Sequence, residues 1–75
     1  MTDATNKKLR DGQTVYLKHP TDDVVAMLVP DTDHTLVKWK RDGLEYSVKD
    51  TTDLATDMRI LGVEITEKEY LEYGK

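Results

Sequence analysis

The chain has 75 residues, 35% of them charged, with a formal net charge of −4 and no cysteine. A chain of this length forms one small domain, and the lack of cysteine excludes disulfides, thiolate catalysis and cysteine-based zinc sites. The longest apolar run, residues 24–29, is far shorter than the ~20 residues that span a bilayer, and no apolar segment opens the chain. We therefore predict a cytoplasmic protein without membrane contacts.

The N-terminal part combines a polar lead-in with a first strand. Residues 1–8 are small or charged and show no periodicity, so they are predicted to form a flexible tail. Alternation of apolar and polar residues predicts a strand at residues 14–19, with Val15 and Leu17 facing the core. Tyr16 is then expected on the outer face of this strand.

Two further segments predict the centre of a sheet. Residues 24–29 are all apolar, which predicts a strand that is buried on both faces or covered by another segment. Residues 35–49 predict a β-hairpin, because Asp-Gly at positions 42 and 43 suits a two-residue type I′ turn. This turn places Trp39 opposite Tyr46 and assigns one face of the hairpin to the core. The face expected to contact the core holds Val37, Trp39, Leu44, Tyr46 and Val48.

The last third of the chain mixes turn and cap signals. Residues 49–57 are mostly polar, with Leu54 as the one buried candidate, and predict a short helical or 3₁₀ turn, followed by a strand at residues 58–65. Thr66 and Glu69 have the spacing of a capping box, which predicts a helix in residues 66–75. A helix this short is unstable alone, so we expect it to dock on the rest of the domain. The complete predicted core is Val15, Leu17, Val25, Met27, Val37, Trp39, Tyr46, Val48, Leu54 and Ile60.

Several short motifs resemble those of small SH3-like barrels of the KOW-like and Tudor-like kind. GQTVYL at residues 12–17 resembles their opening strand, and LVKW at 36–39 with DG at 42–43 resembles their hairpin. YSV at 46–48 and DL at 53–54 resemble the strand and turn that follow. The resemblance covers residues 11–61 and implies a mostly β fold: a five-stranded barrel (residues 9–65) with a short turn before the last strand. It also implies a module that binds peptides, methylated side chains or nucleic acid.

Catalytic and metal chemistry are not indicated by the sequence. His19 and His34, the only histidines, are predicted in separate solvated loops, and two unpaired histidines do not make a zinc site. The chain has no glycine-rich phosphate loop, and no nucleophile–base pairing is suggested by its motifs. We therefore predict no enzyme activity, no metal and no cofactor.

Two kinds of binding surface remain open. Small barrels bind partners in aromatic grooves or by adding a strand to an edge, so a protein or peptide partner is favoured. The alternative is weak, sequence-independent nucleic-acid binding through the basic outer face of the hairpin. The candidate protein contacts are Tyr16, Leu36, Tyr70 and Tyr73. The candidate nucleic-acid contacts are Lys18, Lys38, Lys40, Arg41 and Lys49.

Overall fold

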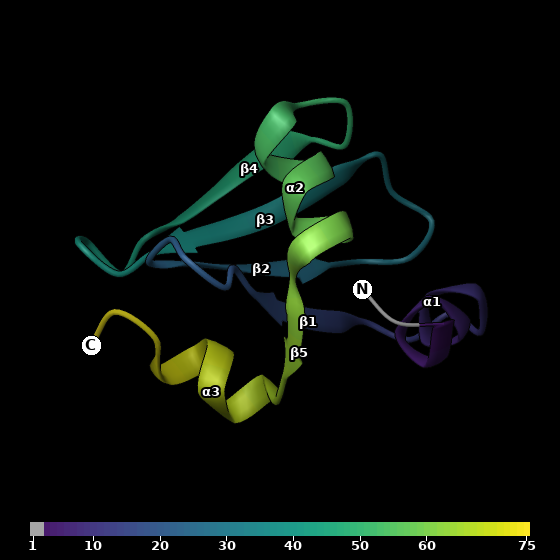
Figure 1. The fold of residues 1–75 in the computed structure, drawn as a ribbon, viewed down its shortest axis with the longest axis horizontal. Coiled ribbons are helices and arrows are strands. Elements are labelled where there is room, and N and C mark those ends of the chain that lie inside the picture. The colour runs from purple at the N-terminus through teal and green to yellow at the C-terminus, as the bar shows by residue number, and fades with distance from the viewer. Residues whose placement is uncertain (1–2) are drawn as a thin grey trace.

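The computed structural model describes residues 3–75, which form five strands and three helices (Figure 1). All strand pairs are antiparallel, in the order β4-β3-β2-β1-β5. Within this range β4 and β5 do not pair with each other, so the sheet is open. No helix of residues 3–75 is long and apolar enough to cross a membrane. The elements are α1 (Asp3–Arg10), β1 (Val15–Lys18), β2 (Val24–Leu28), β3 (His34–Trp39), β4 (Glu45–Lys49), α2 (Asp53–Leu61), β5 (Val63–Ile65) and α3 (Glu67–Glu72).

The main core lies between one face of this sheet and α2. Val15 and Leu17 of β1 are buried as predicted. The register places Leu17 opposite Ala26 and Ala26 opposite Val37, and residues directly opposite each other share a face. The cluster consists of Val15, Leu17, Val24, Ala26, Leu28, Val37 and Met58, with Leu9, Trp39, Val48 and Leu54 partly buried against it.

The side-chain alternation of β2 is the reverse of the prediction. Val25 and Met27 were predicted in the core, but they lie on the opposite face of the sheet, because Ala26 is the residue that shares a face with Leu17 and Val37. The prediction that this strand is buried on both faces is confirmed for Val25, which is fully buried. A uniformly apolar strand carries no polar residue that would reveal its alternation, so the neighbouring strands decide it.

The central hairpin has a longer loop than the two-residue turn predicted. Val37 pairs with Tyr46 rather than with Val48, and residues 40–44 form the connection. The Gly43 N–H donates to the Trp39 carbonyl at 2.8 Å, and the Asp42 side chain accepts from the Leu44 N–H at 3.0 Å. A shift of two residues keeps each side chain on its predicted face, since strands alternate with a period of two.

A helix replaces the predicted strand at residues 58–61. The Thr52 side chain caps α2 by accepting from the Ala55 N–H, and Ala55 and Met58 form the buried side of the helix. With 3.6 residues per turn, Ile60 then faces solvent and is 66% exposed, so its predicted place in the core is wrong. Tyr46 was also wrongly predicted to lie in the core: it lies on β4, at the edge of the sheet, and is 45% exposed.

The N-terminal segment is helical over residues 3–8, where a tail was predicted; residues 1 and 2 lie outside the described range. Thr5 is buried and its hydroxyl donates to the Glu64 carboxylate at 3.1 Å. Lys8 forms an ion pair with the same carboxylate. Glu64 lies opposite Leu17 in the β1–β5 pair. These contacts attach α1 to the side of the sheet on which α2 packs. They explain why this segment is held on the domain and is not a tail.

The opposite face of the sheet is covered by α3. Thr66 and Glu69 form the predicted capping box, with both reciprocal hydrogen bonds present. Tyr70 is 1% exposed and packs against Tyr16 of β1. The short C-terminal helix therefore docks on its own sheet, and the sheet is covered on both faces.

Gly62 joins α2 to β5 where no side chain fits, so Gly62→Ala is expected to destabilise the protein. A Cβ at this position would lie 2.3 Å from the Met58 carbonyl oxygen and 3.0 Å from the Leu17 Cβ. Such overpacking costs about 1–3 kcal/mol. Urea denaturation of this variant beside Asp57→Ala, an exposed change on α2, measures the difference. Equal midpoints for the two variants would contradict this packing.

Candidate interaction surfaces

Two of the four predicted protein contacts, Tyr16 and Leu36, lie on the sheet face beneath α3, and a third, Tyr70, lies on α3 itself. The rings of Tyr16 and Tyr70 are 5.3 Å apart between centroids, and Leu36 is half-buried on the same face. The Tyr70 hydroxyl donates to the Glu45 carboxylate at 2.7 Å. Burial, and then this carboxylate, raise the pKa of Tyr70 far above its usual range. Tyr70 therefore anchors α3 to the sheet and is not a free contact residue.

Lys38, a predicted nucleic-acid contact, is buried under the same helix. It is 6% exposed, and its Nζ donates to the Tyr70 carbonyl at 2.7 Å. The same Nζ lies 4.4 Å from the centroid of the Tyr70 ring. Alternation correctly placed Lys38 on the face away from the main core, but it did not reveal that α3 covers this face. The Lys38 ammonium group therefore interacts with Tyr70 inside the domain.

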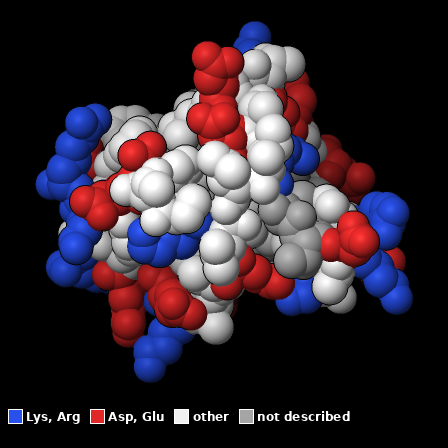
Figure 2. Space-filling model, viewed as in Figure 1, with Lys and Arg blue, Asp and Glu red and all other residues white. Residues whose placement is uncertain are grey.

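Of the remaining predicted basic residues, Lys18 and Lys40 line one hollow together with Glu69 and Glu72, whereas Arg41 and Lys49 are not among the residues that line it. The Nζ of Lys18 donates to the His19 carbonyl at 3.1 Å and lies 5.9 Å from the half-buried Tyr73 ring. The Arg41 guanidinium lies over the Trp39 ring at 5.2 Å. Lys40 and Lys49 are exposed on the loop and on β4. Figure 2 shows basic and acidic side chains interspersed around an uncharged centre on the face that carries α2.

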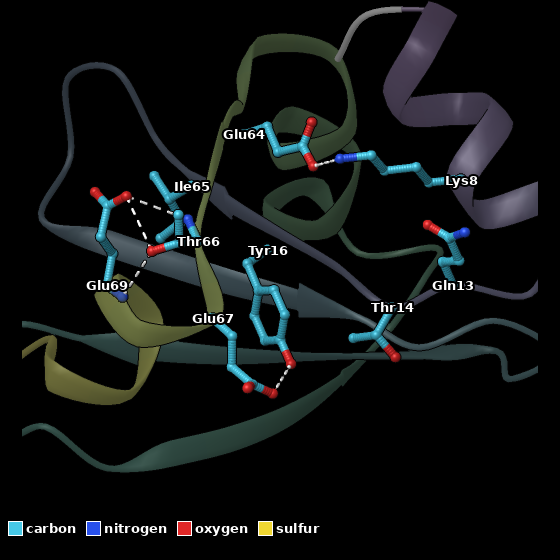
Figure 3. Close-up of a pocket in the computed structure, with 9 residues that line it drawn as sticks. All are labelled: Lys8, Gln13, Thr14, Tyr16, Glu64, Ile65, Thr66, Glu67 and Glu69. Carbon is cyan, nitrogen blue, oxygen red and sulfur yellow. Dashed lines mark hydrogen bonds and ion pairs between the residues drawn. The ribbon is translucent and has the colours of Figure 1, made fainter.

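An open hollow of about 450 Å³ lies between α1, β1, β5 and the start of α3 (Figure 3). Two of its carboxylates have partners within the hollow: Glu64 forms an ion pair with Lys8, and Glu67 accepts from the Tyr16 hydroxyl at 2.8 Å. The hydrogen bond from Lys8, more than that from Thr5, holds the pKa of Glu64 below its usual range. Burial and the Glu67 carboxylate raise the pKa of Tyr16. The polar contacts in this hollow thus link α1 to β5 and β1 to α3.

The histidines have structural surroundings. His19 is buried, contrary to the predicted solvated loop, and its Nδ1 accepts from the backbone N–H groups of Thr21 and Asp22 at 3.2 and 3.1 Å. His34 lies beside Asp33, with 2.6 Å between its Nδ1 and the carboxylate. Across residues 3–75 no three histidine or acidic side chains are gathered as metal ligands would be.

Every second residue of β4 points its backbone groups away from β3, toward the outer edge of the sheet. The Asp50 N–H donates to the Asp33 carbonyl at 2.8 Å, which makes these two residues a hydrogen-bonded pair of the β3–β4 ladder. Such pairs alternate along an antiparallel ladder, so Val48 and Tyr46 also bond to β3. The backbone groups that therefore point away from the sheet are the N–H and C=O of Glu45 and Ser47 and the N–H of Lys49. The Lys49 carbonyl already accepts from the Thr52 N–H at 3.0 Å and from the Thr52 hydroxyl at 2.9 Å.

Apolar side chains flank this edge near the hairpin loop. Tyr46 is 45% exposed and Leu44 is 59% exposed. The Tyr46 hydroxyl donates to Asp42 at 2.8 Å, and Asp42 also accepts from the Leu44 N–H. The Leu44 N–H, and then the Tyr46 hydroxyl, hold the pKa of Asp42 below its usual range. Asp42 thus links the hairpin loop to Tyr46 on the edge strand.

The β4 edge was not predicted as a site. One signal for it exists in the sequence: β4 has only two apolar residues, Tyr46 and Val48, whereas the central strand β2 is entirely apolar. This contrast is typical of an edge strand beside a central one. Comparison with known proteins gives no match to any family model, curated protein or solved structure. Function is therefore inferred from the surface alone.

Proposed function

We propose that this protein is a non-enzymatic interaction module whose β4 edge binds an extended polypeptide segment by strand addition. The observation that carries this proposal is the open edge itself, with outward N–H and C=O groups at Glu45 and Ser47 and an outward N–H at Lys49. Main-chain hydrogen bonds at such an edge provide affinity, and alternate side chains provide specificity. The exposed Tyr46 offers the ring against which a partner side chain packs.

We retain the SH3-like barrel as the proposed fold family. Its support is the order of elements: four strands in sequence, a helix, and a fifth strand that pairs with the first. The sheet is open between β4 and β5, and α2 is longer than the short turn that the resemblance implies. This opening leaves the β4 edge accessible to an added strand.

A protein partner is favoured over nucleic acid because the basic face is incomplete. Lys38 is buried, Lys18 bonds to a carbonyl, and the whole chain is acidic. A nucleic-acid site needs several lysines or arginines that are free to contact phosphates. Lys40, Arg41 and Lys49 keep exposed side chains, but Arg41 already stacks on Trp39.

The test uses a displayed library of random linear peptides as the probe. Peptides selected on the wild-type protein are titrated into the labelled protein, and shifts are expected at the amides of Glu45, Ser47 and Lys49. Ser47→Pro removes one outward N–H without removing a bond to β3, and proline is tolerated on edge strands. It should weaken binding at least about fivefold, since one hydrogen bond contributes about 1 kcal/mol.

Ser47→Ala is the matched control, because it retains the N–H and changes only an exposed side chain. It should bind the selected peptides like the wild type. Unchanged binding by Ser47→Pro would contradict strand addition at this edge. Shifts confined to the hollow beside Glu64 and Glu67 would move the binding site there instead.

A further inference from the structure

We infer that the segment added at the β4 edge is β4 of a second copy of this chain, in an antiparallel, two-fold symmetric dimer. This inference rests on the proposed function, because it names the partner of the same edge. Glu45 and Ser47 point both backbone groups outward, and Lys49 points its N–H outward while its carbonyl accepts from Thr52. These three residues are evenly spaced about Ser47. A two-fold axis through Ser47 therefore pairs this set with itself.

Charge complementarity selects this register. With Ser47 opposite Ser47 of the second copy, Glu45 lies opposite Lys49, and the same pair recurs on the other side of the axis. Both side chains are exposed and lie on the α3 side of the sheet, since Glu45 is opposite Lys38 in β3. Opposite charges directly across a strand pair stabilise it. A slip of two residues in either direction removes both charge pairs.

The other face of the same register is apolar. Tyr46 falls opposite Val48 of the second copy, again twice, on the α2 side of the sheet. These would be non-hydrogen-bonded pairs, in which side chains approach most closely. Tyr46 is 45% exposed and Val48 is partly buried, so this contact covers an aromatic ring that the single chain leaves in solvent. Aromatic and β-branched residues are favourable cross-strand partners.

The dimer joins two open sheets into one continuous sheet through a single strand pair. Such an interface is at the small end of the range for specific complexes, so the dimer is expected to form reversibly with rising concentration. Its two charge pairs are solvent-exposed, which makes its stability dependent on salt.

The test is sedimentation velocity of the full chain from micromolar to millimolar concentration. Wild type should dimerise, and Lys49→Glu should raise the dissociation constant about tenfold, because it places two carboxylate pairs across the axis. Lys40→Glu is the matched control: it makes the same charge change on the exposed loop outside the register. It should dimerise like the wild type.

A mixture of two variants tests the register itself. Glu45→Lys and Lys49→Glu each place like charges across the axis, but one copy of each restores both opposite-charge pairs. The mixture should therefore dimerise more tightly than either variant alone. Glu45 also accepts from Tyr70, so if Glu45→Lys fails to fold, Ser47→Pro replaces it and should abolish the dimer.

The outcomes separate this inference from the proposed function. A wild-type protein that stays monomeric at millimolar concentration overturns the dimer, as does a dimer insensitive to Ser47→Pro or Lys49→Glu. If library peptides still shift the amides of Glu45, Ser47 and Lys49 in a monomeric protein, strand addition stands with another partner. If neither peptides nor a second copy bind there, both are overturned.

Discussion

Tyr70→Ala is expected to lower the free energy of unfolding by about 3–5 kcal/mol, as for other large buried aromatic residues. Tyr70 is 1% exposed, stacks on Tyr16 and covers the amine of Lys38. Its loss removes the anchor of α3, a six-residue helix that is too short to persist alone. Urea denaturation followed by Trp39 fluorescence measures the change.

Two controls separate packing from hydrogen bonding at this position. Tyr70→Phe keeps the ring and removes only the bond to Glu45, so it should cost about 1 kcal/mol. Leu71→Ala changes the next residue of α3, which is 53% exposed, and should stay within about 0.5 kcal/mol of the wild type. A Tyr70→Ala variant as stable as Leu71→Ala would show that Tyr70 does not hold α3 on the sheet.

The features that the sequence predicted correctly depend on neighbouring residues in the chain. The capping box requires only Thr66 and Glu69, three positions apart, and both of its bonds are present. The strand containing Val15 and Leu17 requires only alternation, and these two residues are buried as expected. Local signals of this kind predict the same local structure irrespective of distant residues.

The features that were wrongly predicted depend on distant residues. The segment that begins at Met58, in which apolar residues surround Arg59, is compatible with a strand, but the Thr52 cap and the burial of Ala55 and Met58 favour a helix. Arg59 adds an ion pair to Asp50 at 3.0 Å. Whether Tyr46 is buried depends on whether another strand lies beside β4. The one signal in the sequence is that β4 has only two apolar residues, and it appears only by contrast with the entirely apolar β2.

The candidate surfaces illustrate the same limit. Alternation placed Tyr16, Leu36 and Lys38 together on one face of the sheet, and the register confirms that they share it. Their predicted role as exposed contacts depended on that face being free. It is covered by α3, whose docking was expected but whose position on the sheet was not. The exposed surface that we propose for binding is instead the edge of β4.

Lys38→Glu is expected to destabilise the protein by about 3–5 kcal/mol, the range for leaving a buried charge uncompensated. The new carboxylate would face the Tyr70 carbonyl, the negative face of the Tyr70 ring and the nearby Glu45. Each of these groups favours a cation at this position, and α3 would have to leave the sheet to hydrate an anion. Urea denaturation and the amide spectrum of α3 report the loss.

Two matched changes isolate burial as the cause. Lys40→Glu reverses an exposed charge on the hairpin loop and should change the stability by less than about 0.5 kcal/mol. Lys38→Met keeps the volume and removes the charge, so it should stay near wild-type stability; the Tyr70 carbonyl still accepts from the Tyr73 N–H. If Lys38→Glu and Lys40→Glu were equally stable, Lys38 would be solvent-accessible and the basic face would again be a candidate for nucleic acid. If they differ as expected, charge-reversal variants that test binding at this face must be made at Lys40 and Lys49, because Lys38→Glu would displace α3 first.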